Sequence, residues 1–163
     1  MIDDLLSNAA SYEETFDRGK LERAPRRRLA IVTCMDARID IASILGLREG
    51  DAHVIRNAGG LIADDEIRSL AISQRKMGTR SIMLVHHTDC GMLFFSEDEF
   101  RRELEAETGI AVPWQPESFE DLDVDVRESI ARVRSSPFLP HRDDVRGFVY
   151  EVETGVLREV LAD

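Results

Sequence analysis

The chain has 163 residues, of which 43% are hydrophobic and 33% are charged, a composition typical of a globular domain with a substantial core. Its formal net charge of -11 opposes nonspecific binding to nucleic acid or to anionic membranes, because both attract lysine and arginine. No apolar run approaches the roughly 20 residues of a membrane span. We therefore expect neither nucleic acid nor a membrane as a partner.

The first predicted element is a helix near the N-terminus. Apolar residues recur at Ile2, Leu5, Leu6 and Phe16 between acidic positions, and the stripe ends near Gly19. Such a helix needs a surface to pack on, and the residues alone favour its own domain. The first four residues lack the basic and then apolar order of a signal peptide, so we expect a cytoplasmic location.

Further elements alternate between strand and helix along the chain. Strands are predicted at 29–32, 52–55, 82–85, 145–152 and 156–160, and helices at 39–47, 64–77, 96–107 and 119–133. The segment 52–85 is a strand-helix-strand crossover, for which a parallel pair is expected, and the last two strands are predicted to form a hairpin. The sequence therefore predicts an α/β fold with a central, mostly parallel sheet of about five strands flanked by helices.

Two short motifs follow two of the predicted buried strands. Cys34-Met35-Asp36-Ala37-Arg38 comes after the first strand, and His87-Thr88-Asp89-Cys90-Gly91 comes after the third. Ligands gather at the carboxyl ends of parallel strands, so we expect Cys34, His87 and Cys90 to converge. Two thiolates and an imidazole suit zinc, and three protein ligands leave a fourth position open for catalysis.

Those three residues alone leave a metal site and ordinary core packing both open. Buried cysteines often act as small core hydrophobes, and a histidine is more often structural than a ligand. Asp36 and Arg38 favour the metal site, because a carboxylate two residues from Cys34 is followed by an arginine that can bind it in bidentate fashion. Such a carboxylate either binds the metal or accepts a hydrogen bond from what the metal holds.

Both motifs resemble those of the β-class carbonic anhydrases, whose pattern is Cys-x-Asp-(Ser/Ala)-Arg followed later by His-x-x-Cys-Gly. The segments 49–52 and 54–59 also resemble this family, and the likeness is closest over residues 29–90. The resemblance implies that residues 1–163 form a single domain of this type. It further implies that residues 1–23 are an N-terminal arm lying across a second subunit, in a homodimer or a larger homo-oligomer.

The resemblance also implies an activity, the zinc-dependent reversible hydration of carbon dioxide to bicarbonate and a proton by attack of zinc-bound hydroxide. One zinc ion per chain is then held by Cys34, His87 and Cys90. Asp36 is either a fourth ligand in a closed form or the partner of the hydroxide, and Arg38 holds Asp36 off the metal in the active form.

The motifs say less about which residues bind the substrate, and they leave other functions open. The amide of Gly91 is expected to donate to bicarbonate on the resemblance alone, and Arg56 either assists anion binding or forms a structural salt bridge. A related alternative is hydrolysis of carbon disulfide or carbonyl sulfide. A noncatalytic zinc-stabilised binding domain, with Asp36 as the fourth ligand, and a redox pair of Cys34 and Cys90 are the alternatives from other classes.

Overall fold

Five strands form one sheet within residues 2–162, which are the residues that the computed structural model describes. The strands are β1 (Leu29–Cys34), β2 (Ala52–Asn57), β3 (Ser81–His87), β4 (Val145–Tyr150) and β5 (Leu157–Val160). Their order is β2-β1-β3-β4-β5, in which the first four are parallel and β5 runs antiparallel to β4. The predicted α/β fold with a mostly parallel sheet is confirmed.

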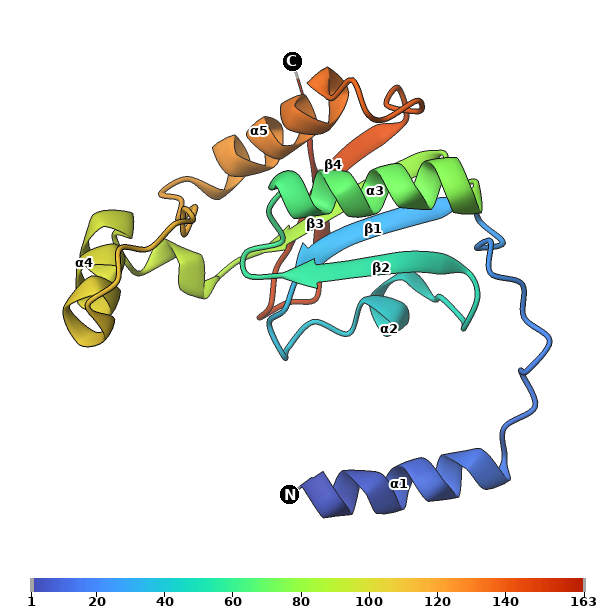
Figure 1. Ribbon diagram of the computed structural model, residues 1–163. Coiled ribbons are helices and arrows are strands. Elements are labelled where there is room, and N and C mark those ends of the chain that lie inside the picture. The colour runs from blue at the N-terminus through green and yellow to red at the C-terminus, as the bar shows by residue number, and fades with distance from the viewer. Residues whose placement is uncertain (1, 163) are drawn as a thin grey trace.

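Helices cover the two faces of this sheet unequally. Helices α3 (Asp64–Met77) and α5 (Leu122–Ser135) cover one face, and the short helix α2 (Ile41–Leu45) lies against the other (Figure 1). Leu70 of α3 and Ile130 of α5 pack with Val32 and Leu84 of the central strands in one buried cluster. This core fixes β1 and β3 relative to each other and therefore fixes the loops at their carboxyl ends.

The central strands β1 and β3 are buried on both faces, as their apolar sequences predict. Successive side chains of β3 still point to opposite faces. His86 points toward α5, where its Nδ1 lies 2.8 Å from Oδ2 of Asp125, whereas His87 lies with Cys34 and Cys90 on the other side. His87, and not His86, is therefore the histidine of β3 that lies on the side of the two cysteines.

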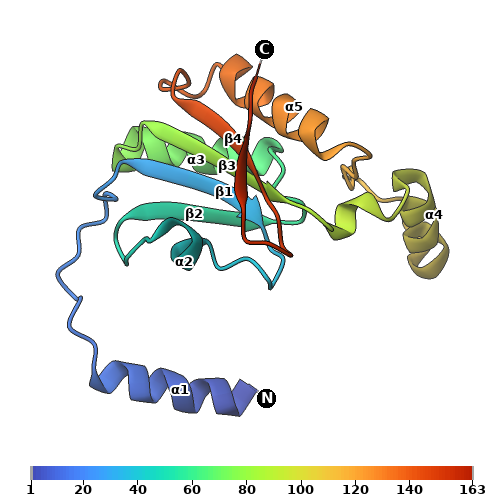
Figure 2. The ribbon, with the colours of Figure 1, turned by 180° about the vertical axis from the view of Figure 1, so that it is seen from behind.

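The first helix, α1 (Ile2–Glu14), lies apart from the sheet (Figures 1 and 2). Its residues are all exposed, and it ends before Phe16, earlier than the apolar stripe suggests. Tyr12 in its last turn donates a hydrogen bond of 2.6 Å to Glu49, which ties that end to the loop before β2. Packing on its own sheet, favoured by the residues alone, is not seen for residues 2–14.

The remaining helices lie beyond the carboxyl end of β3. A 3-10 helix, η1 (Gly91–Leu93), follows the second motif, and α4 (Glu97–Thr108) projects away from the sheet (Figure 2).

Throughout residues 2–162, no helix combines the length and the hydrophobicity needed to cross a membrane.

Candidate metal centre

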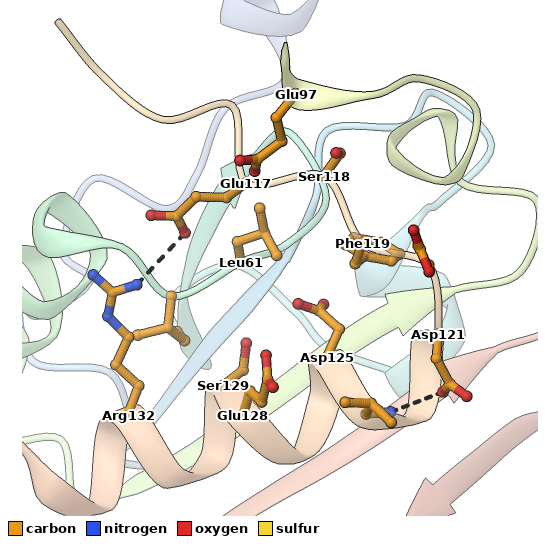
Figure 3. Close-up of a pocket in the computed structure, with 13 residues that line it drawn as sticks. Leu61, Glu97, Glu117, Ser118, Phe119, Asp121, Asp125, Glu128, Ser129 and Arg132 are labelled. Carbon is orange, nitrogen blue, oxygen red and sulfur yellow. Dashed lines mark hydrogen bonds and ion pairs between the residues drawn. The ribbon is translucent and has the colours of Figure 1, made fainter. Parts of the chain in front are cut away.

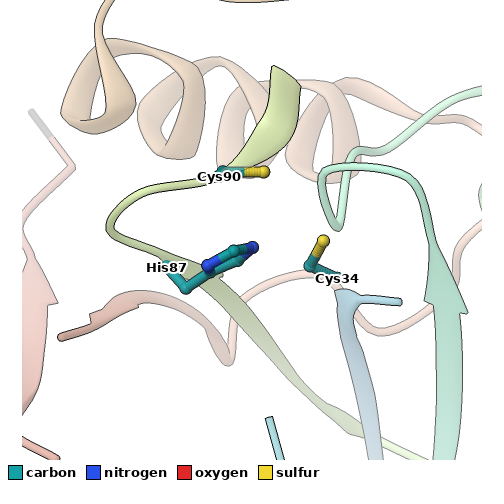
Figure 4. Close-up of side chains that lie close together, drawn as sticks. All are labelled: Cys34, His87 and Cys90. Atoms are coloured by element: carbon teal, nitrogen blue, oxygen red, sulfur yellow. The ribbon is translucent and has the colours of Figure 1, made fainter. Parts of the chain in front are cut away.

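The side chains of Cys34, His87 and Cys90 form one compact cluster, as the two motifs predict (Figure 4). Cys34 is the last residue of β1, His87 is the last of β3, and Cys90 lies three residues further on. Because β1 and β3 are adjacent and parallel, their ends meet at the same edge of the sheet. The two sulfur atoms and one imidazole nitrogen all lie within 4.8 Å of one another, and all three residues are buried.

His87 is oriented so that one ring nitrogen faces the two cysteines. Its Nδ1 lies 2.9 Å from the carbonyl oxygen of Thr88, which accepts a hydrogen bond when that nitrogen is protonated. This leaves Nε2 with its lone pair, and Nε2 is buried with no hydrogen-bond partner among the described residues. A histidine fixed through one nitrogen by a carbonyl is the usual arrangement of a metal ligand.

The two cysteines share one buried environment. Cys34 and Cys90 are 4% and 1% exposed, too buried for solvent to replace a missing partner. The hydrogen bond between their sulfur atoms lowers the pKa of Cys34, with a further contribution from His87, and raises the pKa of Cys90. One thiolate therefore forms readily beside an imidazole. This donor set fits a borderline-soft ion such as zinc better than it fits apolar packing.

A glycine permits the close approach of a neighbouring loop to the first ligand. Gly60 has a φ of +75°, and a Cβ there would lie 2.9 Å from the backbone nitrogen of Cys34. Any side chain at position 60 must therefore displace Cys34 or move the loop that follows β2.

The carboxylate of Asp36 lies beside the cluster and is held by Arg38. The guanidinium donates from Nε to Oδ1 at 3.0 Å and from Nη2 to Oδ2 at 2.8 Å. These hydrogen bonds lower the pKa of Asp36, against the opposing effect of burial. Oδ2 of Asp36 is 3.9 Å from Nε2 of His87, so the carboxylate is adjacent to the metal ligands while bound to arginine.

Arg38 also contacts Asp89, a residue that the sequence analysis did not select. Nη1 of Arg38 donates to Oδ2 of Asp89 at 2.7 Å, and Nη2 donates to the Asp89 carbonyl at 2.9 Å. Asp89 lies between His87 and Cys90 and has a φ of 55°. The sequence held one signal for Asp89, an acidic residue inside the His-x-x-Cys spacing, but its contact with Arg38 is visible only in the structure.

Arg56 binds the loop after β1 through all three of its nitrogen atoms. It donates to the carbonyl oxygens of Cys34 at 2.9 Å, Asp36 at 2.7 Å and Ile39 at 3.0 Å. These contacts are hydrogen bonds to backbone and not the salt bridge that the sequence suggested as its structural role. Gly91 is exposed and begins η1, directly after Cys90.

A separate cavity of about 520 Å³ lies between α5 and the loop that precedes it (Figure 3). Six acidic residues and Arg132 are among its lining, and Arg132 is 3.5 Å from Glu117. Asp125, the neighbour of His86, also lines it. The residues of the Cys-His-Cys cluster are not among those that line this cavity, so the two features are distinct.

Fold and site together define an α/β protein with a buried Cys-His-Cys cluster, suited to a metal ion, at the carboxyl edge of a parallel sheet. The carbonic anhydrase family model matches residues 29–114. β-Carbonic anhydrase 1 of Mycobacterium tuberculosis is 53% identical over 160 residues, which cover 98% of each chain. The crystal structure of carbonic anhydrase from Streptococcus mutans superposes with a TM-score of 0.92 at 40% identity, covering 98% of this chain and 97% of that one.

The chain belongs to the β-carbonic anhydrase family, as its two motifs predicted. The chain is also similar to proteins with a different activity in their names. Carbon disulfide hydrolase of Saccharolobus solfataricus is 33% identical over 185 residues, covering 98% of this chain and 90% of the hydrolase.

Proposed function

We propose that this protein catalyses the reversible hydration of carbon dioxide to bicarbonate and a proton, with one zinc ion per chain as cofactor. The observation that carries the proposal is the buried cluster of Cys34, His87 and Cys90 with the ion pair of Asp36 and Arg38 beside it. The close relatives named as β-carbonic anhydrases support it. Zinc bound by three protein ligands lowers the pKa of water at its fourth position and so supplies the nucleophile.

The protein's own groups have three tasks in this proposal. Cys34, His87 and Cys90, which are all buried, would hold the ion, and the hydrogen bond from His87 to Thr88 keeps its Nε2 available. Asp36 remains an anionic hydrogen-bond acceptor next to the ligands, because Arg38 stabilises its charge. Arg38 also keeps this carboxylate from becoming a fourth ligand, which separates the proposal from a noncatalytic four-ligand zinc domain.

Gly91 and Arg56 remain predicted contributors to substrate binding. Gly91 is exposed and directly follows Cys90, which supports a role for its backbone amide in binding an anion near the cluster. Arg56 donates to three carbonyl oxygens of the loop that carries Asp36, so its contacts favour a role in holding that loop. Its assistance in anion binding therefore depends on a rearrangement of these hydrogen bonds.

We further propose that residues 1–163 form one domain in which residues 1–23 are an arm that packs on a second subunit. The exposed apolar side chains of α1 support a homodimer or a larger homo-oligomer. We propose a cytoplasmic location because a metal site that includes Cys34 and Cys90 requires reduced thiols, which a reducing compartment maintains.

Carbon disulfide or carbonyl sulfide is the alternative substrate. The carbon disulfide hydrolase relative favours it, because it matches nearly the whole chain. Like carbon dioxide, carbon disulfide and carbonyl sulfide are linear molecules with an electrophilic carbon. The same cluster can therefore serve hydration of carbon dioxide or hydrolysis of these two compounds.

The test is a stopped-flow assay of carbon dioxide hydration on protein whose zinc content is measured by elemental analysis. We expect one zinc per chain. We also expect the rate of carbon dioxide hydration to be at least as high as the rate of carbon disulfide hydrolysis. Cys34→Ser and Cys90→Ser should sharply reduce bound zinc, since each removes a thiolate ligand. Full hydration activity in metal-free protein would overturn the proposal, and so would release of sulfide from carbon disulfide by zinc-loaded protein that does not hydrate carbon dioxide.

A further inference from the structure

The guanidinium of Arg38 connects the two loops that carry the metal ligands. On one side it binds both carboxylate oxygens of Asp36, at 3.0 and 2.8 Å. On the other side it binds the carboxylate and the carbonyl of Asp89, at 2.7 and 2.9 Å. Its orientation therefore depends on a residue of the second motif as well as on its partner in the first.

The side chains of Arg38 and Asp89 are both exposed. We infer that their contact orients Arg38 and adds little to the free energy of unfolding. The side chain of Arg38 is 46% exposed and that of Asp89 is 60% exposed. Exposed ion pairs contribute little to the free energy of unfolding, because water screens them and side-chain entropy opposes them. A long arginine side chain at such a surface has many rotamers, so a second fixed acceptor restricts which one it adopts.

The backbone of Asp89 is well placed to serve as that fixed acceptor. Asp89 lies between His87 and Cys90, which are both buried, and its φ of 55° keeps it in a tight turn. By contrast, Asp36 needs only a small movement to reach the cluster, since its Oδ2 is already 3.9 Å from Nε2 of His87.

We propose that Asp89 is a positioning residue that holds Arg38 against Asp36 and thereby keeps Asp36 out of the fourth position at the metal. The inference rests on the proposed function and extends it to a residue outside the Asp36 and Arg38 pair. Loss of the Asp89 carboxylate leaves Arg38 with one side-chain acceptor and more rotamers. Asp36 is then freed for part of the time to bind the ion as a fourth protein ligand.

A merely structural role for Asp89, joining the two loops, predicts the opposite effect on metal retention. If Asp89 only stabilises the cluster, its removal loosens the ligands and zinc leaves faster. If Asp89 positions Arg38, its removal adds a carboxylate ligand and zinc leaves more slowly. Zinc release therefore separates the two roles by the direction of the change.

The test uses two variants and one matched control. Asp89→Asn removes the charge but keeps an acceptor, and Asp89→Gly removes the side chain; both residues tolerate a positive φ. Asp65→Asn is the control, because Asp65 is 68% exposed and forms a 2.8 Å ion pair with Arg68 on α3, away from the site. Zinc-loaded proteins are mixed with excess chelator, and zinc release is followed at several pH values alongside carbon dioxide hydration.

We expect slower zinc release than in wild type, with Asp89→Gly more affected than Asp89→Asn. Hydration at neutral pH should fall by about tenfold, within the usual range for a residue that orients a metal site, and should recover at alkaline pH. Faster zinc release, or an unchanged pH profile in both variants while wild type is active, would overturn the role of Asp89. Zinc-loaded wild type without hydration activity would instead overturn the proposed function.

Discussion

Arg38 and Asp36 form a bidentate ion pair in which Nε and Nη2 of the arginine donate to the two oxygens of the carboxylate. This geometry occupies both oxygens, so Asp36 lies next to the Cys-His-Cys cluster without being free to join it. Whether the centre is open or closed by four protein ligands therefore depends on this pair.

Replacing Arg38 with alanine should sharply reduce hydration activity while zinc remains bound. Without the guanidinium, the carboxylate of Asp36 is released to take the fourth position and excludes water from it. The measurement is stopped-flow hydration combined with elemental analysis of the same sample. We expect at least about a tenfold loss of activity, since partners that orient metal ligands commonly contribute that much.

The control for this substitution is Arg68→Ala, which removes an exposed arginine paired to Asp65 and should leave activity unchanged.

Raising the pH should increase activity in wild type, because ionised water then competes better with Asp36 for the open position. Equal activity of Arg38→Ala and wild type across that pH range would refute the role of the pair.

Gly60→Ala should weaken zinc binding through the backbone of Cys34. The new Cβ would lie 2.9 Å from that nitrogen, and the φ of +75° adds strain of about 1 kcal/mol. Gly78→Ala is a matched control, since Gly78 has a φ of +76° but open space around its Cβ position. Both variants should unfold more easily, and only Gly60→Ala should also bind zinc more weakly in a chelator competition. Equal zinc affinities would show that the loop moves aside freely.

The ion pair between Asp123 of α5 and Arg158 of β5 should make stability depend on pH in the acid range. Arg158 donates to both oxygens of Asp123, at 2.7 and 2.9 Å, and lowers the pKa of that carboxyl. A depressed native pKa stabilises the fold above the ordinary pKa of about 3.9, and this contribution is lost as pH falls through the native value. The melting temperature of wild type should exceed that of Asp123→Asn at neutral pH, and the difference should shrink as the pH becomes acidic. A difference that stays constant with pH would contradict this assignment.

The sheet and the metal ligands were predictable because each depends on local patterns. Buried strands such as β1 show an uninterrupted apolar run, and the polar residues that follow them must lie at the sheet edge. Alternation along β3 sends the neighbouring residues His86 and His87 to opposite faces, and the two-residue gap between His87 and Cys90, which is the spacing of the family motif, selects His87. The spacing of the two motifs then identified Cys34 and Cys90.

The side chains that contact the loops around the metal ligands were less predictable, because these contacts depend on where long side chains reach. Nothing in the spacing of the motifs indicates that Arg38 contacts Asp89, which is 51 residues away in the sequence. The same holds for Arg56, which binds three carbonyl oxygens of another loop. Tertiary placement of the loops decides these contacts, and sequence periodicity carries no information about it.

Removing the N-terminal arm should reduce subunit association. The apolar side chains on α1 and just after it are largely exposed, as shown by Ile2 at 72%, Leu5 at 63%, Leu6 at 61% and Phe16 at 48%. A helix of 13 residues is marginal in water on its own, so it requires an apolar surface to remain folded, and residues 2–14 do not pack on the sheet of their own chain. A second copy of the chain supplies such a surface in our proposal. Light scattering should give at least a dimer for the full chain and a smaller mass for a protein that begins at Gly19. Leu5→Ser with Leu6→Ser keeps the chain length and should weaken association in the same direction. An unchanged mass in both would mean that α1 is not a subunit contact.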